Sequence, residues 1–543
     1  MKKIILLFTV CMIGWNIAAQ TLTSSNLPII IINTNGQTIV DDPKITADMG
    51  IIYNGVGARN AVTDPFNQYN GKIGIEIRGQ SSQMFPMKPY GIELRDNSGN
   101  SVNRSLFGLP SESDWILYAP YTDKTLMRNF LAYTLSREMG HWAANCRYVE
   151  VVVDGDYKGI YVFMEKIKRG SGRVNISKMA ATDISGDAVT GGYIFSLDKQ
   201  PDGWFSSYVA PGSFNLSKRQ FSYVYPKLEN ITQQQKDYIK SYVDSFENAL
   251  AGPKFQDPVT GVRKFADIPS FIDYFIVNEV SRNVDGYRLS SYFYKDRNNK
   301  NAKIIAGPVW DYDLAFRNAN YCDGSKITGW AYDFNFACPG DGAGLIPFWW
   351  NSFMNDTAFK GALRCRWKQL RTITLSEGHF NTLIDSVFNL VNEARQRHFQ
   401  RWPVLGQYVW PNPQPIATSY EDEIVSLKTW IKSRLQWIDE NIPNSGACFD
   451  YHYPADRKET IIVSISPNPL QGNGRVTIES KNDQSLTVQV CDAMGRIVLV
   501  KEAQLRVGFN TMDLNSNRWA PGMYFISLWS SGGDKYVKKI LRN

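Results

Sequence analysis

The chain has 543 residues, enough for more than one domain, and its hydrophobic fraction of 43% excludes an intrinsically disordered protein. Its 59 Lys and Arg and 52 Asp and Glu are mixed along the chain, so the net charge of +7 describes an ordinary solvated surface and argues against a nucleic-acid-binding protein. Aromatic residues make up 13%, which fits either a large aromatic core or contact with carbohydrate.

The first 20 residues have the pattern of a signal peptide. Lys2 and Lys3 form a basic start, residues 4–15 are apolar, and residues 17–20 (IAAQ) are a small-residue region with a plausible cleavage point. The apolar run is shorter than the roughly 20 residues that a membrane-spanning helix needs, and no later segment without charges reaches that length. We therefore predict export of the mature chain and no transmembrane segment.

Six cysteines remain after removal of this segment. Cys322 and Cys338 flank a glycine-containing loop, and in an oxidising compartment they form either a disulfide or two buried free thiols. The chain has no CxxC pair and only 4 His, which argues against a zinc site.

A hairpin is predicted early in the chain. Residues 71–78 and 88–95 both alternate between apolar and polar positions, and the small polar residues 79–82 lie in the turn between them. Backbone N–H groups at the tip and Lys88 on the return strand would suit the phosphates of a nucleotide. On its own such a turn is more often a simple connection, and Lys88 a surface residue.

Strands and helices alternate over the next part of the chain. Residues 123–139 predict an amphipathic helix, residues 147–153 and 159–166 two strands around an Asp-Gly turn, and residues 191–198 a further strand. Glu165 lies at a strand exit that could contact an adenine ring. Residues 232–250 and 268–282 predict two helices.

Two acidic sites follow, and they end two different elements. Asp285 lies in an Asn-Val-Asp-Gly turn after the helix, whereas Asp311 and Asp313 follow an apolar strand 26 and 28 residues later. An aromatic strand and a polar hairpin between them would bring these positions together. Such a pair suits phosphoryl transfer, in which one carboxylate orients the acceptor hydroxyl and another holds Mg²⁺. The structural alternatives are a helix-exit turn for Asp285 and a helix N-cap for Asp311 or Asp313.

The remainder divides into a loop, helices and a second domain. Residues 319–350 form a Gly- and aromatic-rich insertion, which suggests a substrate platform or lid. Residues 380–401 and 420–442 predict amphipathic helices that finish the first domain, residues 21–445. Residues 446–459 are the predicted linker, and residues 460–543 read as short strands of a small all-β sandwich.

Five segments of the first domain resemble the CotH kinase family, atypical protein kinases named for a spore-coat protein. They are RGQSSQMFPMKPYGIEL, DWILYAPYTDKTLMRNFL, GDYKGIYVFMEKI, NVDGYRLSSYFYKD and GPVWDYDLAF. The resemblance covers roughly residues 25–445. It implies an α+β, two-lobed, protein-kinase-like domain that uses ATP and Mg²⁺ to phosphorylate Ser, Thr or another extracellular acceptor, protein or glycan.

The resemblance also implies roles for individual residues. Asp285 would be the catalytic acid of an NxD motif, and Asp311, Asp313 and Ser290 would be the metal ligands. Nucleotide binding would fall to Arg78, Gly79, Ser81, Ser82, Lys88 and Glu165, with Lys88 on the phosphates. One departure is that ordinary kinases carry Asn about five residues after the catalytic Asp, where this chain has Ser290 and Ser291. The alternative function is therefore a surface binding or structural protein on a pseudokinase scaffold, without catalysis.

The second domain resembles the type A C-terminal sorting domain of the type IX secretion system of Bacteroidetes. The motifs are SPNP at residues 466–469, DAMGR at 492–496, GMY at 522–524 and the basic end KKILRN. This resemblance implies translocation by the type IX machinery to the cell surface or medium, with removal of the domain. A generic adhesion domain would fit the strand pattern equally and predicts no removal.

Overall fold

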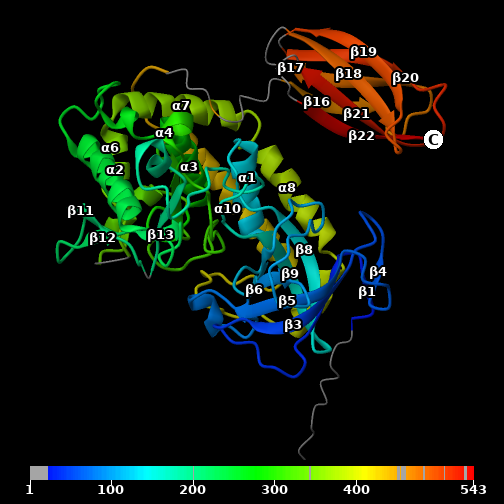
Figure 1. Ribbon diagram of the computed structural model, residues 1–543, viewed down its shortest axis with the longest axis horizontal. Coiled ribbons are helices and arrows are strands. Elements are labelled where there is room, and N and C mark those ends of the chain that lie inside the picture. The colour runs from blue at the N-terminus through cyan, green and yellow to red at the C-terminus, as the bar shows by residue number, and fades with distance from the viewer. Residues whose placement is uncertain are drawn as a thin grey trace, which may run out of the picture. The chain divides into compact units, whose positions relative to one another are not determined.

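The computed structural model describes residues 22–199, 201–340, 344–448, 453, 460–480, 484–506, 508–530 and 535–543. The chain forms two compact units, residues 1–451 and 452–543 (Figure 1). The first contains helices and sheets and the second contains strands, so the α+β domain followed by an all-β domain is confirmed. The predicted signal peptide and most of the predicted linker lie outside the described residues.

Seven strands of the first unit close into a barrel in the order β2-β3-β5-β6-β7-β9-β8. Only β2 and β8 pair in parallel among these neighbours. The predicted hairpin is β5–β6, with Ile77 opposite Tyr90, so residues 79–82 leave one end of the barrel. Barrel closure itself was not predicted. The bounds are β2 Ile29–Asn33, β3 Ile45–Ile52, β5 Tyr69–Ile77, β6 Tyr90–Arg95, β7 Asp114–Tyr118, β8 Cys146–Val153 and β9 Asp156–Glu165.

Smaller sheets complete the strands of this unit. A four-stranded sheet has the order β13-β10-β14-β15, and two-stranded pairs form between β1 and β4 and between β11 and β12. The strand predicted before Trp310 is only two residues long, because Pro308 has no N–H to continue a ladder. The bounds are β1 Ser24–Ser25, β4 Asn60–Ala61, β10 Tyr193–Leu197, β11 Phe205–Val209, β12 Lys218–Gln220, β13 Ser222–Tyr225, β14 Ser291–Lys295 and β15 Ile305–Ala306.

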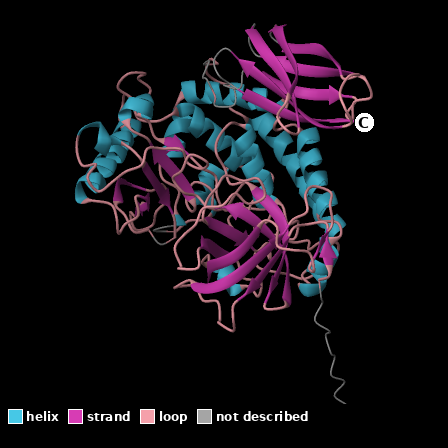
Figure 2. Cartoon of the chain, turned by 45° about the vertical axis from the view of Figure 1, so that its right-hand side comes forward, coloured by secondary structure: helices cyan, strands magenta, loops and turns pink. Residues whose placement is uncertain are grey.

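Helices form the other part of the first unit (Figure 2). Helix α3 is buried along its whole length, and α1, α7 and α10 pack against it. Side chains set the helix starts: Thr232 and Gln235 form a capping box on α2, and Ser419 caps α10. The bounds are α1 Arg128–Glu138, α2 Gln233–Ala251, α3 Ile268–Ser281, α4 Asn298–Asn301, α5 Phe334–Ala337, α6 Trp349–Asn355, α7 Thr357–Arg371, α8 Glu377–Leu390, α9 Ala394–Arg401 and α10 Tyr420–Asn441. Short 3₁₀ turns are η1 Ser81–Met84, η2 Gly186–Thr190, η3 Val262–Lys264 and η4 Ala331–Asp333.

Two predicted helices differ from those observed. The helix expected from residue 123 begins at Arg128, because the Asp123 carboxylate accepts hydrogen bonds from the backbone N–H groups of Thr125 and Arg128 and so forms a turn. The helix expected over residues 380–401 is two helices, α8 and α9, separated by residues 391–393.

The second unit is a β-sandwich. Its two antiparallel sheets have the orders β16-β17-β20 and β19-β18-β21-β22. Val476 and Ile478 of one sheet share a core with Val488 and Ile526 of the other, and all four are fully buried. The bounds are β16 Thr460–Ser466, β17 Asn473–Ser480, β18 Gln484–Asp492, β19 Ile497–Leu505, β20 Gly508–Asn515, β21 Gly522–Ser530 and β22 Lys535–Arg542.

Two disulfides cross-link the first unit. Cys322 and Cys338 form a disulfide, the first of the two alternatives considered for them, whereas the disulfide Cys365–Cys448 was not predicted. Within the described residues, no helix combines the length and apolarity needed to cross a bilayer.

Candidate functional site

A cleft runs between the barrel and the helical part of the first unit. The barrel contributes the ends of β5, β7 and β9, and the opposite wall comes from α1, the end of β10, β14 and the loops after α3 and β15. Most of the residues that the sequence singled out line this one cleft: Arg78, Gly79, Ser81, Ser82, Asp285, Ser290, Asp311 and Asp313. Lys88 and Glu165 are not among the lining residues.

The two acidic segments are tied to each other by the Asn of the NxD motif. The Asn283 side-chain amide donates to the Asp311 carbonyl over 3.3 Å, and the backbone N–H of Asp285 donates to Asn283 Oδ1 over 3.2 Å. One side chain therefore fixes the spacing of segments 26 residues apart in sequence. Helix-exit residues Asn, Asp and Gly favour such a turn, but here the turn also holds the second segment.

Helix α1 holds the Asp311 segment from the other side. The Asp311 N–H donates to the Tyr133 hydroxyl over 3.0 Å, and the Tyr312 N–H donates to Asn129 Oδ1 over 2.6 Å. Asp311 has a positive φ of 63°, a left-handed conformation that costs a non-glycine residue about 1–3 kcal/mol. The surrounding hydrogen bonds maintain that conformation, which turns the Asp311 side chain into the cleft.

The carboxylates of the cleft repel one another. Asp311 reaches solvent through the cleft, but protein surrounds its other sides, and this desolvation together with the charge of Asp285 raises its pKa to about 6. Burial, followed by the charges of Asp311 and Asp123, raises the pKa of Asp313 well above its usual value. A bound cation would relieve both effects. Among the described residues, however, no three His, Cys, Asp or Glu side chains lie close enough together to hold a metal ion by themselves.

Two cations face these carboxylates. Nη1 of Arg78 is buried without a hydrogen-bond partner, and the guanidinium lies 5.9 Å from the centre of the Trp310 ring. Desolvation lowers the pKa of Arg78, and the nearby Asp311 partly opposes this. Lys199 extends from the end of β10, and its Nζ lies 3.3 Å from Ser81 Oγ. An anionic oxygen would satisfy the free Arg78 nitrogen, so this side of the cleft fits a polyphosphate.

Lys88 and Glu165 occupy other environments. Lys88 Nζ donates to the Gln83 carbonyl over 2.5 Å, and this hydrogen bond stabilises the η1 turn. Glu165 is fully buried at the end of β9, and its Oε2 accepts from the backbone and side-chain nitrogens of Asn145, both at 2.9 Å. The structure therefore does not bring these two side chains to the cleft lining.

Three titratable lining residues were not among those that the sequence singled out. Asp198 and Lys199 follow β10, and burial raises the pKa of Asp198. Tyr118 ends β7, and its buried hydroxyl has no hydrogen-bond partner. Each lies at the end of a strand, as Glu165 does. Position at a strand end, and not residue type, would therefore have indicated these three residues.

Comparisons with known proteins identify both units. The profile of a family described as CotH kinase protein matches residues 75–438, and that of a secretion system C-terminal sorting domain matches residues 464–543. No curated protein matches the chain significantly.

Solved structures give local similarity only. A β-glucosidase from Listeria innocua in complex with glucose is 18% identical with a TM-score of 0.13, over 19% of this chain and 18% of that one. A β-glucosidase from Kluyveromyces marxianus is 12% identical with a TM-score of 0.13, over 20% of this chain and 17% of its own. The chain thus spans less than a fifth of the length of these proteins.

Proposed function

The chain belongs to the CotH kinase protein family and ends in a secretion system C-terminal sorting domain, and from this premise we propose that it is an exported, ATP-dependent kinase. It transfers the γ-phosphoryl group of ATP to the hydroxyl of Ser, Thr or another extracellular acceptor. The observation that carries the proposal is the convergence of Asp285 and Asp311 on a cleft that also contains the unpartnered Arg78 nitrogen. Carboxylates and cations that face one another in one cleft are what phosphoryl transfer requires.

The residues divide into three roles in this proposal. Arg78, Lys199 and the turn at residues 79–82 bind the phosphates, while Asp311, Asp313 and Ser290 are the candidate ligands of Mg²⁺. The magnesium ion, when bound, would neutralise charge on the phosphates. Burial, together with the repulsion between carboxylates, raises the pKa of Asp311 and Asp313, and both effects support a cation there.

Asp285 accepts the acceptor's proton. The acceptor oxygen forms a bond to the γ-phosphorus, the bond from that phosphorus to the β–γ bridging oxygen breaks, and ADP leaves with the bond's electron pair. The hydroxyl proton passes to the Asp285 carboxylate. Catalysis by this site is mainly positioning and charge stabilisation.

The barrel and the helical part would serve as the two lobes of a kinase-like domain. The cleft between them is lined by β5, β7 and β9 on one side and by β10, β14 and the Asp285 turn on the other. The nucleotide would lie between these walls.

Transfer of label from γ-³²P-ATP tests the proposal directly. Wild-type protein should label an acceptor or itself in the presence of Mg²⁺, and Asp285→Asn and Asp311→Asn should each lose most of this activity. Asp385→Asn is the matched control, because Asp385 lies on α8 in an exposed pair with Lys428. Equal labelling by all four proteins would contradict the assigned roles.

Export through the type IX machinery is part of the same proposal. The sorting-domain match supports translocation to the cell surface or medium, with the signal peptide and the C-terminal domain removed. Retention of the intact C-terminus on the exported protein would contradict removal.

A surface binding protein without catalysis is the second candidate. The observation that favours it is Lys88, whose ammonium group bonds to Gln83 instead of facing the cleft. Wild-type protein that binds glycan or protein tightly but transfers no label would support this candidate.

A further inference from the structure

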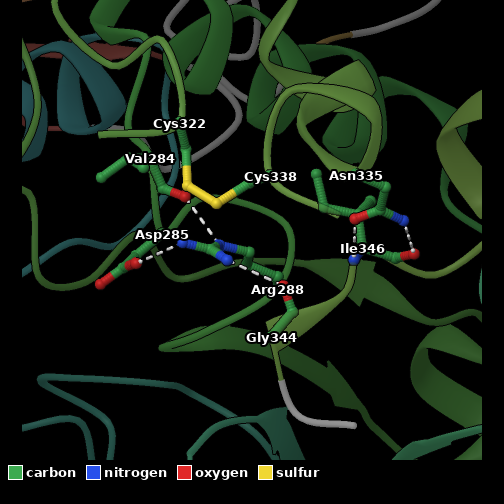
Figure 3. The surroundings of a disulfide bond; sticks show 8 residues. All are labelled: Val284, Asp285, Arg288, Cys322, Asn335, Cys338, Gly344 and Ile346. Carbon is green, nitrogen blue, oxygen red and sulfur yellow. Dashed lines mark hydrogen bonds and ion pairs between the residues drawn. A yellow bond between two sulfur atoms is a disulfide. The ribbon is translucent and has the colours of Figure 1, made fainter. Parts of the chain in front are cut away.

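Arg288 lies one turn beyond Asp285 and contacts it directly. Its Nη2 is 3.2 Å from Asp285 Oδ1, and its Nε donates to the Val284 carbonyl over 2.7 Å (Figure 3). The side chains of Arg288 and Asp285 are 8% and 12% exposed, so the pair is largely shielded from competing water. Arg288 therefore holds one oxygen of the Asp285 carboxylate and the backbone beside it at the same time.

The third bond of this guanidinium leads away from the cleft. Arg288 Nη1 donates to the Gly344 carbonyl over 2.8 Å. Two residues later, the backbone N–H and carbonyl of Ile346 bond to the Asn335 side chain at 2.7 and 2.9 Å. The buried Asn335 of α5 thus fixes the segment that anchors Arg288 (Figure 3).

A disulfide fixes the end of α5. Cys338 directly follows that helix and is bonded to Cys322. The loop between them is held by buried arginines: Arg282 Nε donates to the Asp323 carbonyl over 3.0 Å, and Arg434 Nη1 donates to the Gly329 carbonyl over 2.7 Å. Gly344 lies outside the loop that this disulfide closes, but Asn335 inside the loop bonds to Ile346, so the anchor of Arg288 is tied to a cross-linked segment.

We infer that Arg288 is the positioning residue for Asp285 and that the segment closed by Cys322–Cys338 holds Arg288 in place. The inference rests on the proposed function. With Oδ1 engaged by the guanidinium, Oδ2 is the oxygen left to accept the acceptor's proton. A planar guanidinium makes the three divergent bonds at once, which the single nitrogen of lysine cannot do. Reduction of the disulfide loosens the anchor, so the oxidised protein is the more active form.

Kinetics of full-length variants test the inference. Arg288→Gln and Arg288→Lys should lower kcat by about 100-fold, the cost of a misplaced catalytic group, with the KM for ATP within about twofold of wild type. Thermal unfolding verifies that each variant is folded.

The disulfides supply a matched pair. Cys322→Ser/Cys338→Ser should lower kcat several-fold, whereas Cys365→Ser/Cys448→Ser, at the other disulfide, should leave kcat unchanged. An unchanged kcat in Arg288→Gln would overturn the inference while the proposed function stands. If wild-type protein transfers no phosphate, the proposed function fails. The positioning role is then tested by crystal structures of wild type and Arg288→Gln. A changed Asp285 rotamer in the variant would support the inference, and an unchanged rotamer would overturn it.

Discussion

Replacing Arg78 by methionine separates a binding role from a structural one. A charge-assisted hydrogen bond contributes about 1.5–3 kcal/mol, so its loss should weaken ATP binding by about 10- to 150-fold. Without nucleotide the variant should be slightly more stable. A buried donor without a partner costs about 1–3 kcal/mol, whereas the contact with Trp310 contributes about 0.5–1 kcal/mol. With the middle of each range, the net gain is roughly 1 kcal/mol, which corresponds to about 1 °C for a unit of this size.

Two measurements decide this prediction. Titration calorimetry at pH 7.5 gives the ATP affinity, and thermal unfolding at pH 5 gives the stability while Asp311, with its pKa of about 6, is mostly protonated. Arg95→Met is the control, because Arg95 lies on β6 with its Nη2 2.8 Å from Glu93 Oε2 and does not line the cleft. Unchanged ATP affinity together with a lower melting temperature in Arg78→Met would refute the reasoning, since Arg78 would then be a structural residue.

The other predictions concern pH, the lysines and export. The raised pKa of Asp311 predicts that Mg²⁺ affinity, measured by calorimetry, falls about tenfold for each pH unit below 6, and a flat profile would contradict it. Protonated Asp311 is favoured in the folded state, because its pKa is higher there than in the unfolded state. Its contribution to the free energy of unfolding of the metal-free protein should therefore decline as the pH rises from 3.8 to about 6. Thermal melts of Asp311→Asn should lack that decline. Lys199→Met should weaken ATP binding about tenfold and Lys88→Met by less than about twofold, and the reverse order would restore Lys88 as the phosphate lysine. Deletion of residues 460–543 should trap the protein in the periplasm, and mass spectrometry of exported wild type should find a C-terminus near residue 455 rather than at residue 543.

Local pattern predicted the elements, whereas closure of the barrel depended on distant pairings. The hairpin β5–β6 was visible because its apolar positions alternate with period two. The parallel pairing of β2 with β8 joins Ile30 to Val151, and nothing near either residue in sequence indicates the partner. The same holds for Cys365 and Cys448, which are 83 residues apart.

At the site, residue type and spacing predicted the carboxylates better than the cations. Asp285 and Asp311 lie in the loops that follow α3 and β15, so their positions in the chain already bring them to the cleft. A lysine side chain is long and flexible, so the position of its ammonium group depends on which acceptor the fold places nearby. Lys88 meets the Gln83 carbonyl of the η1 turn, a group that exists only once that turn has formed, whereas Lys199 reaches Ser81.

A crystal structure with a non-hydrolysable ATP analogue and Mg²⁺ tests the central claim most directly. The account predicts the γ-phosphate within hydrogen-bonding distance of Arg78 and Lys199, with the cation bound to Asp311. A nucleotide bound elsewhere on the protein, with Arg78 still unpartnered, would contradict it.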